Sequence, residues 1–128
     1  MFGMFGKKED ALDEDTLLSA GVTAAVAFRL TEKKFGFTPV NETSKLIEKC
    51  KKQACEMLSI NPDERSRTVL HMMTLTLAMD DSGLAEDITN RYERGDKSIY
   101  SDEARKIWAL TTQKSQEVAG AFSNNGKR

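Results

Sequence analysis

Val69-Leu70-His71-Met72-Met73-Thr74-Leu75-Thr76-Leu77-Ala78-Met79 is a stretch without a charged side chain, and large apolar residues fall on every side of it. A favourable helix start precedes it, because Asn61 can cap a first turn and Pro62 suits the first helical position. The segment 62–80 is too long for an ordinary strand. A helix that is apolar nearly all round is usually covered by other helices. We therefore predict a helix over 62–80 at the centre of a bundle.

Apolar residues recur at intervals of three and four in four further segments, which predicts four more helices. These segments are 16–34, 39–58, 83–94 and 101–122. Gly36 and Gly95 stand where two of the helices should stop. The chain has few other glycines or prolines, so it offers few of the turns that a set of strands would need. The predicted fold class is all-α, a compact bundle of about five helices with the 62–80 helix central.

A chain of 128 residues suits one domain with a real core. We predict that residues 1–15 form a flexible N-terminal arm, in which Phe2 and Phe5 are followed by an acidic stretch. Residues 16–122 should form a single helical domain. The polar segment 123–128 should be a disordered tail.

Small residues surround Gly21 in the middle of the first predicted helix. A glycine inside a helix costs about 1 kcal/mol relative to alanine, so a close neighbour is a natural reason to tolerate it. The last predicted helix offers matching small residues at Ala119, Gly120 and Ala121. We therefore predict that the first and last helices approach closely at this point.

Charge and composition exclude several classes of protein. Lysine and arginine number 19 against 20 acidic residues, so the chain has no overall basic or acidic bias toward a partner. No apolar run approaches the roughly 20 residues of a bilayer span, and no secretory signal is present. Cys50 and Cys55 should point in different directions on one helix, which indicates reduced thiols and a cytoplasmic location.

The sequence contains no recognisable catalytic motif. The single histidine, His71, has no acid three or four residues away, although a partner from another helix stays open. Two cysteines and one histidine lack the spacing of a zinc site, and no phosphate-binding or nucleophile-elbow motif occurs. We predict no enzyme, no cofactor and no metal. The alternative is an enzyme whose site is assembled from scattered polar groups, with Asp80, Asp81, His71 and Tyr92 as candidates.

The leading functional hypothesis is a non-enzymatic intracellular helical protein that acts through protein–protein binding, in an adaptor, accessory, chaperone-like or inhibitor role. Its partner would be another protein or a second copy of the chain. The segment 39–58 carries a short apolar seam, and methionines suit adaptable binding surfaces as well as cores. The seam consists of Val40, Thr43, Ile47, Cys50, Ala54 and Met57. The candidate interaction surface consists of Phe2, Phe5, Lys45, Lys49 and Lys52.

The alternative function is a nucleic-acid-binding regulator that uses the basic helix face of residues 45–52. No arginine or aromatic residue is interleaved with these lysines, and a solvated face is the commoner explanation of such a stripe. Attachment to a membrane surface through Phe2, Phe5, Lys7 and Lys8 is a further hypothesis, which needs more apolar area than these residues supply.

Overall fold

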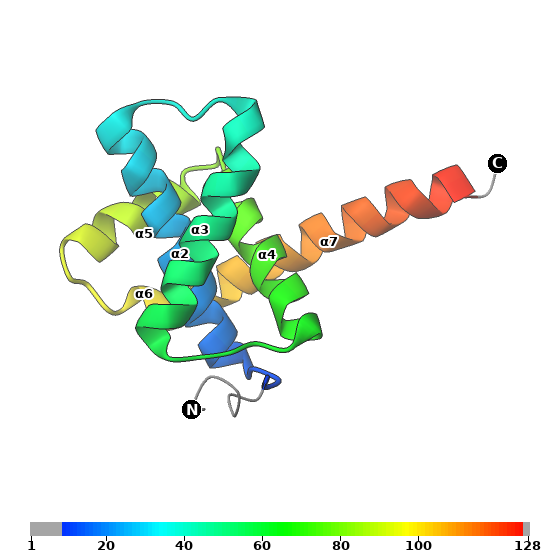
Figure 1. The fold of residues 1–128 in the computed structure, drawn as a ribbon, viewed down its shortest axis with the longest axis horizontal. Coiled ribbons are helices and arrows are strands. Elements are labelled where there is room, and N and C mark those ends of the chain that lie inside the picture. The colour runs from blue at the N-terminus through cyan, green and yellow to red at the C-terminus, as the bar shows by residue number, and fades with distance from the viewer. Residues whose placement is uncertain (1–8, 127–128) are drawn as a thin grey trace, which may run out of the picture.

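A computed structural model describes residues 9–126 of the chain, with side chains through residue 117. Over these residues it contains six helices and, apart from one isolated bridge between Asp10 and Pro62, no β-structure (Figure 1). The helices are α2 (Glu14–Phe35), α3 (Val40–Leu58), α4 (Glu64–Ala78), α5 (Leu84–Glu93), α6 (Ile99–Asp102) and α7 (Ala104–Gly126). The predicted all-α bundle is confirmed.

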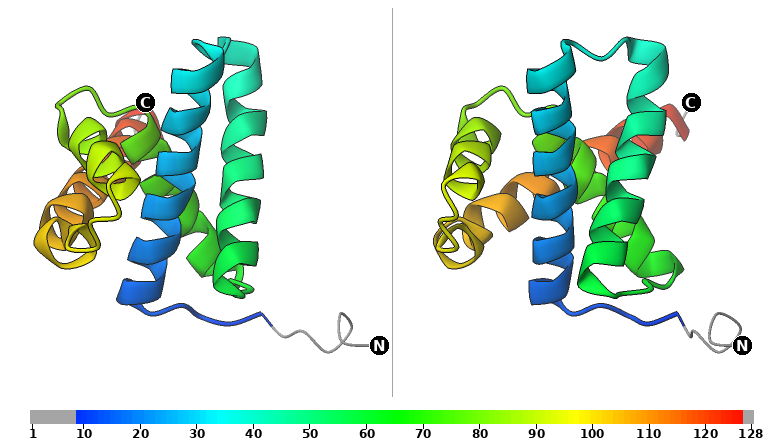
Figure 2. Two further views of the ribbon diagram at one scale, coloured as in Figure 1. Left: turned by 90° about the vertical axis from the view of Figure 1, so that its left-hand side faces the viewer. Right: turned by 60° about the vertical axis from the view of Figure 1, so that its left-hand side comes forward.

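Helix α2 runs through the middle of the bundle. Figure 2 shows α3 alongside one flank of α2, while α5 and the start of α7 lie toward the other flank. Ala20, Val22, Ala24 and Phe28, which point to different sides of α2, are all completely buried. Helix α2 can be buried on several sides because most of its side chains there are apolar.

Helix α4 packs against α2, α3, α5 and α7, so its predicted central position is confirmed. Its cap differs from the prediction. The N-cap is Asp63, whose carboxylate accepts a hydrogen bond from the Ser66 amide at 2.8 Å, and the proposed capping role of Asn61 is wrong. Pro62 lies in the extended segment before the helix, where it forms the bridge with Asp10.

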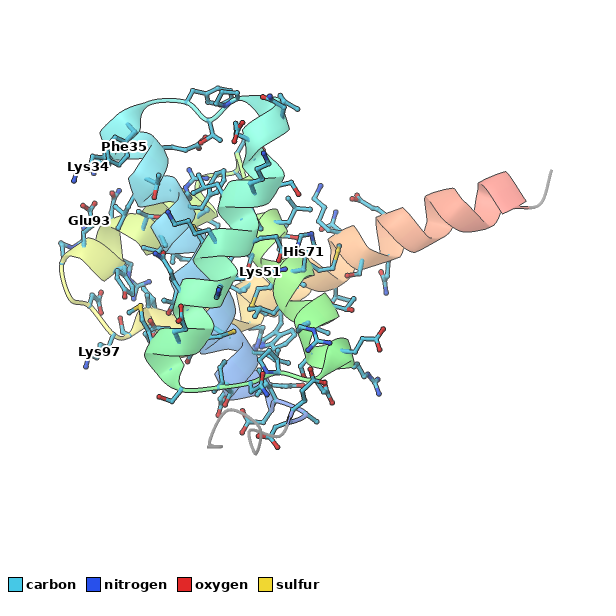
Figure 3. The ribbon with its side chains drawn as sticks, in the orientation of Figure 1. Lys34, Phe35, Lys51, His71, Glu93 and Lys97 are labelled. Carbon is cyan, nitrogen blue, oxygen red and sulfur yellow. The ribbon has the colours of Figure 1, made fainter. Side chains whose placement is uncertain are left out.

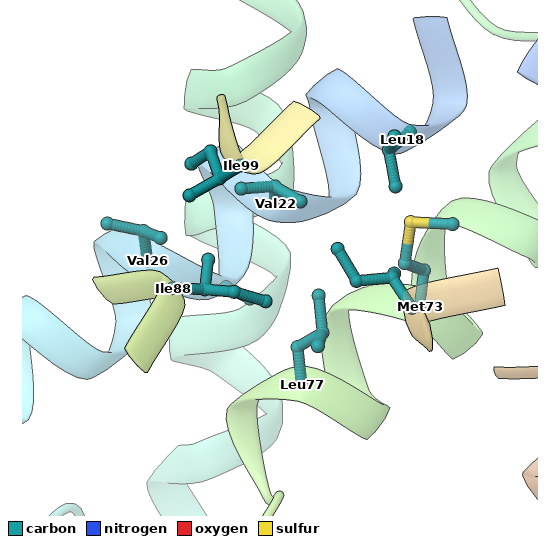
Figure 4. Close-up of a cluster of buried hydrophobic side chains, with 9 residues drawn as sticks. Leu18, Val22, Val26, Met73, Leu77, Ile88 and Ile99 are labelled. Atoms are coloured by element: carbon teal, nitrogen blue, oxygen red, sulfur yellow. The ribbon is translucent and has the colours of Figure 1, made fainter. Parts of the chain in front are cut away.

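The main core cluster lies where α2 meets α4 and the C-terminal helices (Figure 4). It combines Leu18, Val22, Ala25 and Val26 of α2 with Met73, Leu77, Ile88, Ile99 and Ile107. A second cluster fills the space between α2, α3 and α4 and contains Ala24, Phe28, Ile47, Cys50, Ala54 and Ala78. Both clusters draw residues from α2 and from α4, so these two helices share the interior.

Gly21 of α2 lies directly against Met73 of α4. A Cβ atom added at Gly21 would lie 2.3 Å from Sδ and 2.7 Å from Cγ of Met73. A close neighbour therefore explains the glycine at position 21, as predicted. The predicted neighbour, the last helix, is wrong, because the neighbour is Met73 of α4. Figure 1 shows the last turns of α7, which include Ala119, Gly120 and Ala121, projecting away from α2. The side chains of residues 118–126 lie outside the described ones.

Residues 9–12 run alongside the segment before α4. Backbone hydrogen bonds join Asp10 to Asn61 and to Asp63, each at 2.8 Å. The Leu12 amide donates to the Ser66 hydroxyl at 2.9 Å, and Glu9 pairs with Arg67 at 2.6 Å. Helix α7 continues to Gly126, four residues past the predicted end at 122. The division of the chain into arm, domain and tail stays a prediction.

Arg91 organises the connection from α5 to α7. Its largely buried side chain pairs with Asp96 at 3.1 Å, Asp102 at 3.2 Å and Glu103 at 3.0 Å. Hydrogen bonds from the hydroxyl and amide of Ser98, followed by the contact with Arg91, lower the pKa of Asp96 to about 2. One guanidinium thus ties this connection together, while Ile99 within it is buried in the main core cluster.

The contact between Gly21 and Met73 gives a prediction for Gly21→Ala. Helix propensity favours alanine by about 1 kcal/mol. Overpacking in a full core costs about 1–3 kcal/mol, so we expect a net loss of stability. In a Met73→Ala background Sδ and Cγ are gone and only Cβ remains, at 3.2 Å from the added atom, so the same change should destabilise the protein less. Urea unfolding of the four proteins measures both effects. An equal effect of Gly21→Ala in the two backgrounds would contradict the contact.

The depressed pKa of Asp96 gives a prediction for Asp96→Asn. A carboxylate with a lowered pKa contributes stability above its unfolded value of 3.8, and that contribution is lost as the pH falls toward 2. The variant should be less stable at pH 7 and should lose less stability than wild type between pH 4 and pH 2. Thermal melts across this range measure the difference, and Asp81→Asn serves as a control at an exposed acid.

Candidate functional site

Large apolar side chains are exposed at one end of the described structure. Phe37, Val40 and Met79 are exposed by 86%, 87% and 50% and line one cleft, and Phe35, the last residue of α2, is exposed two residues before Phe37. Residues of this kind are normally scattered singly on a soluble surface, and a contiguous group marks an interaction site. We call this cleft the apical cleft.

The apical cleft exists because α3 and α4 both pack closely on α2 but only sparsely on each other. Ile47, Leu75 and Ala78 form its apolar lining between the two helices, and its volume is about 580 Å³. This volume is within the range of protein binding clefts. Gly36, with a positive φ of 95°, ends α2 and turns the chain so that Phe37 stands at the cleft edge.

Polar groups at the edge of the apical cleft bind the protein's own backbone. The Arg29 guanidinium donates to the carbonyl oxygens of Ala78 at 3.1 Å and Asp80 at 3.2 Å. The Glu32 carboxylate accepts from the Thr38 amide at 2.9 Å. These bonds hold the α2–α3 and α4–α5 connections in place, and they leave the apolar groups as the main feature presented to a ligand.

A polar bridge joins α3 to α4 where the apical cleft ends (Figure 3). The Lys51 ammonium lies 2.7 Å from Oε1 of Glu48 and 2.9 Å from Nδ1 of His71. The same carboxylate oxygen is 3.5 Å from the imidazole nitrogen. Burial, and then the nearby Lys51, lower the pKa of His71. Hydrogen bonding to Lys51 is the largest cause that lowers the pKa of Glu48. Neutral His71 therefore accepts a hydrogen bond from Lys51.

The polar residues considered for catalysis are only partly brought together. His71 and Asp80 line the apical cleft, whereas Tyr92 packs against the main core cluster and Asp81 does not line the cleft. Asp80 accepts hydrogen bonds from the Ser82 hydroxyl at 2.8 Å and the Ala85 amide at 3.0 Å, which makes it a cap for α5. Within residues 9–126 no cluster of three or more histidine, cysteine or acidic side chains could hold a metal ion.

The predicted interaction residues fall into two groups. Phe2 and Phe5 lie outside the described residues. Lys45, Lys49 and Lys52 are exposed on α3, and the last two line a second groove between α3 and α4. We call it the basal groove; its volume is about 630 Å³. Its other lining residues are Glu48, Lys51, Cys55, Glu56, Ile60, Asn61, Pro62, Arg67 and Leu70.

The apolar seam predicted on α3 is buried only in its middle. Ile47, Cys50 and Ala54 are buried within the bundle, whereas Val40 and Met57 at its two ends are exposed. The signal for the missed site was the pair of aromatic residues beside Gly36, which ends a helix and exposes both of them.

Comparisons of this chain with protein families, with curated proteins and with solved structures find no match. Among the described helices, none combines the length and the apolar character needed to cross a bilayer. The two cysteines are not joined in a disulfide. The function is therefore inferred from the geometry of the two grooves.

The bridge around His71 gives a pH prediction. The pKa of His71 is lowered below 6.5 in the folded chain, so the unfolded chain takes up a proton first as the pH falls. Stability should therefore decrease as the pH falls through about 6.5 and level off below the folded pKa. His71→Gln should reduce this loss between pH 7 and pH 5, as measured by urea unfolding. An unchanged pH profile in the variant would contradict the neutral, lysine-bound imidazole.

Proposed function

We propose that this protein acts by binding another protein, and that the apical cleft is the binding site. The observation that carries the proposal is the exposure of Phe37, Val40 and Met79 around one apolar cleft. Leaving such side chains in water is unfavourable by roughly 25 cal/mol per Å² of apolar surface, and a partner would remove that cost. Buried aromatic anchors of this type commonly dominate binding energy.

The partner that fits best is an amphipathic helix. The apical cleft runs between two helices and is lined by aliphatic side chains, which is the geometry used to bind the apolar face of a third helix. Met79 adds a flexible thioether that can adjust to the side chain it meets. Anchors on the partner would be apolar residues spaced by three or four positions.

The cellular role consistent with this site is that of a cytoplasmic adaptor, accessory, chaperone-like or inhibitor protein. A single small domain with an apolar cleft can hold one segment of a larger protein without performing chemistry on it. The reduced state of Cys50 and Cys55 is compatible with the cytoplasm. A second copy of the chain is another partner that would cover the same surface.

A photo-crosslinking experiment tests the proposed binding site. The photoreactive amino acid p-benzoylphenylalanine replaces Phe37 in cells, and the adduct is identified by mass spectrometry. The matched control places it at Gln113, an exposed position on α7. We expect a specific adduct at position 37 that maps to an amphipathic segment, and none at position 113.

Affinity for the identified segment provides the quantitative test. Phe37→Ser and Val40→Glu should weaken binding of the purified segment at least tenfold, because a lost hot-spot side chain costs about 2 kcal/mol or more. Lys45→Ser, which changes an exposed α3 residue outside both grooves, should leave the affinity unchanged. Equal affinity in all three variants would contradict binding at the apical cleft.

Nucleic-acid binding through α3 is the second candidate. Lys49, Lys52 and Arg67 line the basal groove, which favours an anionic ligand there. Two observations weaken the case for an anionic ligand: Lys51 is paired with Glu48, and Glu56 lines the same groove. A duplex or single strand that bound this face would dissociate steeply with added salt. Absence of binding at 50 mM salt would eliminate this candidate.

A further inference from the structure

The basal groove has an apolar floor and a charged edge. Cys55 of α3, Ile60 of the connection after it and Leu70 of α4 supply apolar lining, while Lys49, Lys52 and Arg67 supply charge. The groove lies where α3 and α4 are linked by the 59–63 connection, and the two helices make few contacts with each other there. An occupant with apolar side chains would therefore complete the packing between them.

The described chain begins at the edge of this groove. Glu9 pairs with Arg67 at 2.6 Å, and Arg67 is itself a lining residue. Asp10 is held to Asn61 and Asp63 by two backbone hydrogen bonds, and Asn61 and Pro62 also line the groove. Residues 9 and 10 are thus fixed beside the groove by one ion pair and two backbone hydrogen bonds. The point at which residues 1–8 join the described chain is therefore at the edge of the groove.

We propose that the segment of residues 2–5 occupies the basal groove of its own molecule, with Phe2 and Phe5 as its apolar anchors. Phe5 precedes Glu9 by four residues, a span of up to about 14 Å, and Phe2 can reach up to about 25 Å. Gly3 and Gly6 allow the chain to turn back over the groove without a side-chain clash. The proposal does not depend on the partner assigned to the apical cleft.

The own-chain occupant is favoured over an unrelated one for an entropic reason. A segment tethered four residues away is present at a high effective concentration, and closing so short a loop adds little conformational cost. The sequence also matches the floor of the groove, since Phe2, Met4 and Phe5 are apolar and Cys55, Ile60 and Leu70 are their counterparts. The docked segment would fasten α3 to α4 at the end of the bundle opposite the apical cleft.

Alkylation of Cys55 by N-ethylmaleimide in the full-length protein tests this inference. Cys55 lines the basal groove and is partly buried, and fully buried Cys50 serves as an internal reference. Replacing both anchors in Phe2→Ser/Phe5→Ser should accelerate alkylation of Cys55 at least threefold. The matched control is Phe35→Ser, which removes an exposed phenylalanine that lines neither groove and should not change the rate. Melting curves by circular dichroism verify that each variant is folded.

A second measurement separates docking from a general loss of structure. A synthetic peptide of residues 1–8, added to the double variant, should restore slow alkylation of Cys55, and the same peptide with both phenylalanines replaced by serine should not. Equal rates in wild type and double variant would overturn the proposal. A wild-type rate that falls with rising protein concentration would also overturn it, because the segment would then occupy the groove of a second molecule.

Discussion

Gly21 of α2 lies against Met73 of α4, and this contact decides how far the two helices can approach. The absence of a side chain at Gly21, together with alanines at positions 20, 24 and 25, lets α4 pack directly on the backbone of α2. A helix with small residues on several sides can be enclosed on all of them, which explains why α2 is shared by both large core clusters. The remaining helices pack on the apolar side chains of α2 and α4 that this contact does not cover.

The two grooves follow from the same arrangement. Since α3 satisfies its apolar middle on α2 through Ile47, Cys50 and Ala54, it does not need to pack along α4. The two helices are joined in the middle by the Lys51, Glu48 and His71 bridge, and open clefts lie on either side of that bridge. A partner at the apical cleft and the chain's own N-terminal segment at the basal groove would cover different apolar surfaces.

Local periodicity was sufficient to predict the five longer helices, because each has an apolar face with a spacing of three and four residues. The four-residue helix α6 (Ile99–Asp102) is too short to show this periodicity and was not predicted. The relative positions of the helices depend on contacts between distant residues. The uncharged segment 16–28 is as apolar as the stretch around Met73, yet only the structure shows that α2 and α4 share the centre. The neighbour of Gly21 could not be predicted because Ala119, Gly120 and Ala121 offered an equally small surface.

The candidate site was predicted less completely than the fold. Lys49 and Lys52 were expected to be exposed on α3, but their place in a groove depends on Arg67 of another helix. Val40 fits the periodicity of the seam and is exposed, because periodicity does not show which part of a helix its neighbours cover. Glu48 is 23 residues from His71 in sequence and was found beside it only in three dimensions.

The central claim is that apolar side chains at the apical cleft are exposed to solvent, whereas Met73, in its contact with Gly21, is not. Methionine methyl NMR with a soluble paramagnetic agent tests it directly, because Met73 is completely buried and Met79 is half exposed. We predict strong broadening of the Met79 methyl signal in the dilute isolated protein and none for Met73. Equal protection of the two methyl groups would show that the cleft is already covered and would contradict the account.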